Sequence, residues 1–73
     1  MLQFETVIDK GKNFTAADLI DKFARENGIE KVNYFGTQLL IDGYFYGYDH
    51  YQIIDNGNGK ETVIVSLALK SIR

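Results

Sequence analysis

The sequence predicts an α+β fold, in which one α-helix packs on a single mostly antiparallel sheet of four to six strands, in the order β-α-β-β-β(-β). Two observations predict it. One amphipathic segment near the N-terminus has the 3.6-residue period of a helix, and the remaining chain consists of β-branched and aromatic runs separated by Gly and Asn. One helix on one face of a sheet lets the two apolar surfaces cover each other.

Length and composition predict one small folded domain over residues 1–73. The chain has a net charge of -2 and is 45% hydrophobic, which is enough apolar surface to fold. It contains no Cys, so neither a disulfide framework nor a Cys-bearing zinc site can form. Its 5 Phe and 5 Tyr residues must therefore supply much of the buried surface.

The first predicted element is a strand, Leu2–Ile8, because Leu2, Phe4 and Ile8 recur at a period of two. A polar loop follows it. The helix is expected over residues 16–27, since Thr15 and Asp18 have the spacing of a capping box. Gly28 is expected to end that helix in the left-handed conformation.

Glycine-containing turns divide the rest of the chain into strands. Asp42-Gly43 suits a two-residue hairpin turn, and residues 55–59 (Asp-Asn-Gly-Asn-Gly) indicate a longer loop. The last strand is apolar on both faces, so we expect it inside the sheet. A polar turn at Asp49-His50 is expected to separate two of the strands. The predicted strands are Lys31–Phe35, Gln38–Ile41, Tyr44–Tyr48, Tyr51–Ile54 and Lys60–Lys70.

No pattern of catalytic or cofactor-binding residues is present, and we expect neither an enzyme nor a bound cofactor or metal. The only His is His50, and the only Ser residues are Ser66 and Ser71. A nucleophile, a base and an orienting acid would have to meet within hydrogen-bond reach, and nothing in the spacing brings them together. The loop that begins at Asp55 lacks the oxygen ligands of an EF-hand at its third and fifth positions.

The unusual feature is a cluster of aromatic residues in one predicted hairpin. Either these side chains pack in the core, or they form a contact surface, since Tyr is enriched at protein interfaces. Gly47 suggests that another element, such as the helix, approaches the opposite side of the strand, which would turn the tyrosines outward. The candidate interaction residues are Tyr44, Tyr46, Tyr48, His50 and Tyr51.

The predicted function is that of a small non-enzymatic module that binds another protein. Regulators and inhibitors, including those encoded by phages and mobile elements, often have this size and lack catalytic residues. Two alternatives stay open: nucleic-acid binding through aromatic stacking, and a structural homo-oligomer that associates through an edge strand such as Leu2–Ile8. Nucleic acid is the less favoured partner, because residues 44–59 contain no Lys or Arg.

The lack of Cys fits a cytoplasmic location. We expect no membrane segment, because no apolar run approaches the length of a span. We expect no signal peptide, because Met1 is followed by Leu-Gln-Phe-Glu and not by a basic region and an apolar run.

Overall fold

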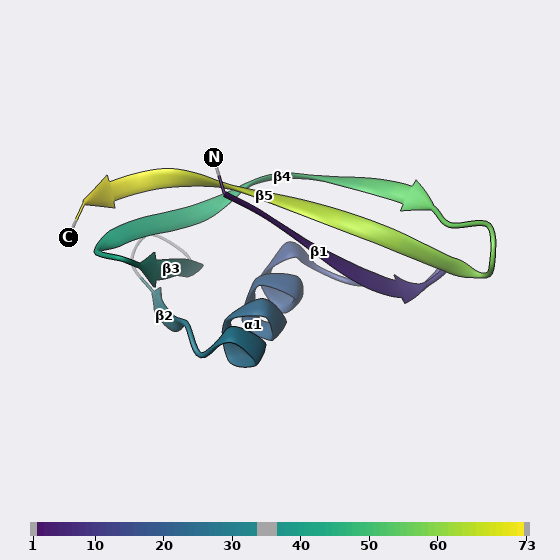
Figure 1. Cartoon of the computed structure of the whole chain (residues 1–73), viewed down its shortest axis with the longest axis horizontal. Helices are drawn as coiled ribbons and strands as arrows, with labels where there is room; N and C mark the ends of the chain where they lie inside the picture. Colours follow the sequence, from purple (N-terminus) through teal and green to yellow (C-terminus); the bar gives the residue numbers. More distant parts are fainter. Residues whose placement is uncertain (1, 34–36, 73) are drawn as a thin grey trace.

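A computed structural model, which describes residues 2–33 and 37–72, shows one helix packed with a five-stranded antiparallel sheet (Figure 1). The predicted α+β fold and element order are confirmed. The strands lie side by side in the order β1-β5-β4-β3-β2. The elements are β1 (Leu2–Asp9), α1 (Ala16–Asn27), β2 (Glu30–Asn33), β3 (Thr37–Ile41), β4 (Tyr44–Asp55) and β5 (Lys60–Ile72).

Helix α1 begins and ends where its sequence predicts. The Asp18 backbone N–H donates to Thr15 Oγ1 at 3.1 Å, and the Thr15 N–H donates to Asp18 Oδ2 at 3.3 Å, which completes the capping box. Gly28 ends the helix at φ 65° and ψ 31°. This left-handed turn lets the Ile29 N–H donate to the Ala24 carbonyl at 2.9 Å and brings Ile29 against the core.

The long β4–β5 hairpin forms the centre of the sheet and runs along most of the 42 Å length of the molecule (Figure 1). β5 lies between β1 and β4, inside the sheet as predicted. β1 pairs only with the first part of β5, from Lys60 to Leu67. β3 pairs only with the first part of β4, as far as Gly47. The two short neighbours therefore flank opposite halves of the hairpin.

Two details of the predicted strands are corrected or lie outside the described residues. Asp49 and His50 do not form a turn: β4 continues through them, and a register shift against β5 falls between Tyr48 and His50. The polar pair is therefore part of a β-bulge, in which one extra residue is accommodated without ending the strand. The first strand after the helix is described only to Asn33, so the predicted positions Tyr34 and Phe35 lie outside the described residues.

The core lies between α1 and the sheet face that α1 covers. It consists of apolar side chains from β1, α1, β3 and β5, and the Phe4 ring from β1 stacks on the Phe23 ring from α1 at 4.2 Å between centroids. The three core side chains of β5 are fully buried. The buried residues are Phe4, Ile8, Leu19, Ile20, Ala24, Leu39, Val63, Val65 and Leu67.

Candidate functional site

The predicted tyrosines lie on the sheet face that α1 covers. Residues directly opposite each other in antiparallel strands point to the same face. Tyr46 lies opposite Leu39 of β3, as the Asp42-Gly43 turn predicts, and Tyr48 lies opposite Leu67 of β5. Both leucines are completely buried in the core beneath the helix.

The bulge places Tyr51 on this same face. With strict alternation Tyr51 would point away from Tyr48, but the extra residue at Asp49 restores the register so that Tyr51 lies opposite buried Val65. Tyr48 and Tyr51 are therefore neighbours, with ring centroids 6.5 Å apart. Strict alternation would place Tyr48 and Tyr51 on opposite faces of the sheet. The bulge places both on one face, where they form one continuous aromatic surface.

Gly47 does not mark the approach of the helix, and this expectation is corrected. A Cβ atom at Gly47 would lie 2.8 Å from Cε and 3.1 Å from Cγ of Lys70, so the Lys70 side chain occupies the space above this glycine. Gly47 lies opposite Ala68, on the face away from the tyrosines. The absence of a Cβ atom thus accommodates a side chain from β5 on the uncovered face of the sheet.

The tyrosines divide between core and surface. Tyr46 is half-buried and packs against the core. Tyr44, Tyr48 and Tyr51 keep 41%, 38% and 45% of their surface exposed, although they point to the covered face, because α1 is shorter than the β4–β5 hairpin. Both interpretations of the sequence therefore apply, each to different members of the cluster.

Three exposed side chains on β4 form an apolar surface, which we call the β4 surface: Tyr48, Tyr51 and Ile53. Ile53 lies opposite buried Val63 and is 43% exposed. The Phe14 ring contacts Tyr51 edge to face, with centroids 5.5 Å apart, and borders the β4 surface on the helix side. Three large side chains held on one rigid strand form a patch that is unlike scattered surface residues.

A second exposed apolar group lies at the other end of the hairpin. Tyr44 lies opposite Ile72, and Leu69 lies two pairs further along, opposite Tyr46. Leu69 is 52% exposed and Ile72 is 71% exposed. The sequence does not identify Ile53, Leu69 and Ile72 as exposed, because their exposure depends on the length of the hairpin relative to α1 and β1.

His50 lies on the opposite face from the tyrosines and does not join the β4 surface. Its Nδ1 lies 2.5 Å from Asp49 Oδ2, and both side chains are exposed. Ser66 lies opposite His50, so the fold brings together an acid, a histidine and a serine. Ser66 is only 1% exposed, however, and its Oγ accepts a hydrogen bond from Gln3 Nε2 at 3.1 Å. A substrate cannot reach that hydroxyl, so the three residues do not form a working nucleophilic centre.

Ion pairs fasten the far end of the hairpin to the end of β1. Lys10 Nζ lies 2.7 Å from Asp55 Oδ2, and Lys60 Nζ pairs with Asp9. The Lys10 hydrogen bond holds the pKa of Asp55 below 3.8, and the Lys60 hydrogen bond does the same to the pKa of Asp9. Asp55 also accepts from the Gly57 N–H at 2.8 Å, which shapes the loop. The carboxylates of Asp9 and Asp55 therefore serve to hold the end of the hairpin against the end of β1.

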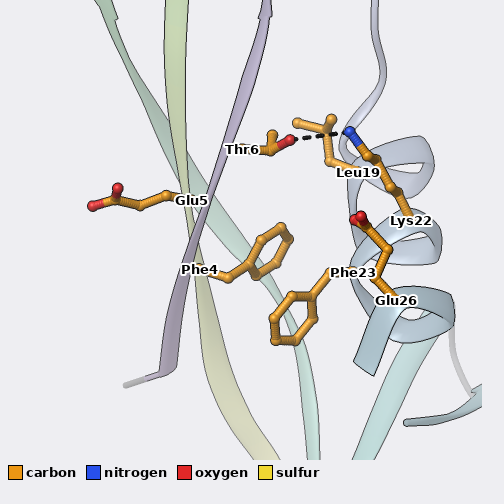
Figure 2. A pocket seen from close by; sticks show the side chains of 7 residues that line it. All are labelled: Phe4, Glu5, Thr6, Leu19, Lys22, Phe23 and Glu26. Carbon is orange, nitrogen blue, oxygen red and sulfur yellow. Dashed lines mark hydrogen bonds between the residues drawn. The ribbon is translucent and has the colours of Figure 1, made fainter. Parts of the chain in front are cut away.

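A shallow pocket lies between β1 and α1 (Figure 2). Phe4 and Phe23 point toward one another inside it, and Lys22 Nζ reaches Thr6 Oγ1 at 3.4 Å across its rim. Glu5, Leu19 and Glu26 complete the lining. Because Phe4 and Leu19 belong to the buried core and Phe23 packs against it, this pocket is part of the core packing.

Within residues 2–33 and 37–72, no three His, Asp or Glu side chains come together to hold a metal ion. No helix in the same residues has the length and apolar character needed to cross a membrane. Comparison of the chain with protein-family models, with curated proteins and with solved structures gave no match.

Proposed function

We propose that this protein is a small cytoplasmic protein-binding module that acts through the β4 surface, as a regulator or inhibitor of the kind that phages and mobile elements encode. The exposure of Tyr48, Tyr51 and Ile53 carries the proposal. Large side chains on a strand need little ordering of the backbone on binding, because the sheet already fixes the backbone. Tyr in particular combines a large contact area with a hydroxyl that can bond at the rim.

The charge distribution favours a protein partner over a nucleic acid. No Lys or Arg occurs between Lys31 and Lys60, while Asp42, Asp49 and Asp55 fall in that stretch. Stacking of bases on tyrosines would need basic residues nearby to neutralise phosphates. A polypeptide has no such requirement, and it can cover aromatic and aliphatic side chains together.

Site-specific photo-crosslinking tests the proposal. A benzophenone amino acid replaces Tyr51 in one variant and Arg25 in a control, and both are produced in the cells that make this protein. Arg25 suits the control because its side chain is 72% exposed and lies on α1, outside the β4 surface. We expect one discrete protein adduct through position 51 and none through position 25. Identical adducts at both positions, or none at position 51, would contradict the proposal.

A further inference from the structure

The second half of β4 has a free edge. β4 pairs with β5 as far as Asp55, but its pairing with β3 stops at Gly47. From His50 to Asp55, no strand in the described part of the chain lies on the other side of β4 (Figure 1). Alternate backbone N–H and C=O groups along these six residues therefore point away from β5 without a strand to receive them.

This edge lacks most of the devices that keep edge strands from pairing. It contains no Lys and no Pro, and it is six residues long. Apolar side chains are exposed on both of its faces: Tyr51 and Ile53 on the helix side, and Ile54, at 44%, on the other. An incoming strand could thus add backbone hydrogen bonds and side-chain contacts on both faces together.

The charges of the edge disfavour a second copy of this chain as the occupant. Two copies can pair antiparallel with faces matched in a register centred on Gln52 or on Ile53, and in both the paired strands carry Asp and no Lys or Arg. The register centred on Gln52 also sets Asp49 of each copy against Asp55 of the other. Like charges directly opposite each other destabilise a strand pair. Asp55 also keeps its own Lys10 partner at 2.7 Å, which a second carboxylate would have to share.

We propose that the occupant is an extended segment of a different protein, which adds as a strand antiparallel to β4 along His50–Asp55. The segment continues the line of β3, so that the sheet remains antiparallel throughout. It carries β-branched or aromatic residues that pack beside Tyr51 and Ile53, and a Lys or Arg opposite Asp49. This inference rests on the proposed function and names the kind of partner and its mode of binding.

The charge requirement follows from the surroundings of Asp49. Its carboxylate lies at the start of the free edge and contacts only the neighbouring imidazole of His50 among the ion pairs of the described residues. Asp55, at the other end, already has a Lys partner. A basic residue in the incoming strand therefore gains most at the Asp49 end, and this determines which residue of the segment lies opposite Asp49.

Selection from a random peptide library, followed by hydrogen exchange, tests the inference. The immobilised full-length protein is used to select displayed ten-residue peptides. We expect enrichment of sequences with alternating β-branched or aromatic residues and one Lys or Arg at a constant position. The Asp49→Lys variant should select Asp or Glu at that position. Glu26→Lys, which makes the same charge change on α1, should select the same peptides as the wild type. The inference would be overturned if no sequence were enriched. It would also be overturned if the Asp49→Lys variant selected peptides with the same basic residue as the wild type.

Hydrogen exchange then locates the peptide. With the best peptide bound, alternate amides of His50–Asp55 should exchange at least tenfold more slowly. N-methylation of one set of alternate peptide amides should abolish binding, while methylation of the other set should not, since a strand uses one set on each edge. Unchanged exchange in His50–Asp55 would contradict strand addition.

The outcomes separate the two proposals. A protein captured through Tyr51 whose complex leaves the β4 edge amides unprotected would show binding by side chains alone. The strand-addition inference would then fail while the proposed function stood. The absence of any adduct at Tyr51 would remove the proposed function itself.

Discussion

The Tyr51 ring on β4 meets the Phe14 ring, which precedes α1, edge to face at 73° between their planes. This contact joins the far half of the hairpin to the start of the helix. Tyr51 thus packs on Phe14 within the fold and leaves 45% of its surface exposed for a partner. Tyr51 therefore both stabilises the fold through Phe14 and forms part of the β4 surface.

A double-mutant cycle measures the structural part of this contact. Edge-to-face pairs contribute about 0.5–1.5 kcal/mol beyond the burial of their area. Phe14→Leu, Tyr51→Leu and the double variant keep apolar volume but remove ring geometry. Urea denaturation should give a coupling free energy in that range. Additive effects of the two substitutions would show that the rings do not support each other.

Gly47→Ala should stabilise the protein less when Lys70 is present than when it is absent. The added Cβ atom would meet Lys70 Cε at 2.8 Å, so this exposed, flexible side chain must turn away, which offsets part of the gain from replacing Gly in a strand. In a Lys70→Ala background the same substitution should give the full gain of about 0.5–1 kcal/mol, because Ala loses less backbone entropy than Gly. Equal effects in both backgrounds, measured by denaturation, would contradict this arrangement.

Local signals in the sequence were enough to predict α1 and the fold class. The Thr15–Asp18 capping box and Gly28 act within one turn of chain, so their outcome does not depend on distant residues. The Asp42-Gly43 turn, with φ of 51° and 83°, likewise determines the register of its own hairpin.

The interaction surface depended on distant contacts and was predicted only in part. Asp49-His50 has the polarity of a turn, but pairing with β5 carries the strand through it as a bulge. The role of Gly47 was misassigned because its neighbour Lys70 comes from the far end of β5. The face of the tyrosines is determined by where α1 packs, and their exposure by how far the hairpin extends past it. Alternation along one strand contains neither kind of information.

The helix cap makes a separate prediction for stability. Thr15→Ala removes the acceptor of the Asp18 N–H and should cost about 1 kcal/mol of unfolding free energy. Thr15→Ser keeps a hydroxyl and should retain most of that stability. Denaturation of the three proteins provides the test, and a Ser variant as unstable as the Ala variant would argue against a role for the hydroxyl.

Acid should weaken the protein through its ion pairs. Lys10 lowers the folded-state pKa of Asp55, and Lys31, whose Nζ lies 2.5 Å from the carboxylate, lowers that of Asp21. A carboxylate with a lowered pKa contributes stability above its unfolded pKa, and this is lost as the pH falls through the lower folded value. The melting temperature should therefore decrease as the pH is lowered beyond about 4.

The charge-removing variant Asp55→Asn isolates one of these pairs. Its melting temperature should depend less on pH in the acid range than that of the wild type. Glu26→Gln, which removes an exposed helix carboxylate, serves as the control. High salt should reduce the difference, because these groups are exposed and screened. Parallel wild-type and Asp55→Asn curves would contradict the role of the Lys10–Asp55 pair.

The affinity of the protein captured through Tyr51 tests the central claim most directly. Calorimetric titration of that partner compares the wild type with Tyr48→Ala, Tyr51→Ala and the control Arg25→Ala, after circular dichroism confirms that each is folded. Tyrosines at the centre of an interface typically contribute enough for a loss of about tenfold or more in affinity. We expect such losses for Tyr48→Ala and Tyr51→Ala and an unchanged Kd for Arg25→Ala. Equal Kd values for all four proteins would contradict the assignment of the β4 surface as the binding site.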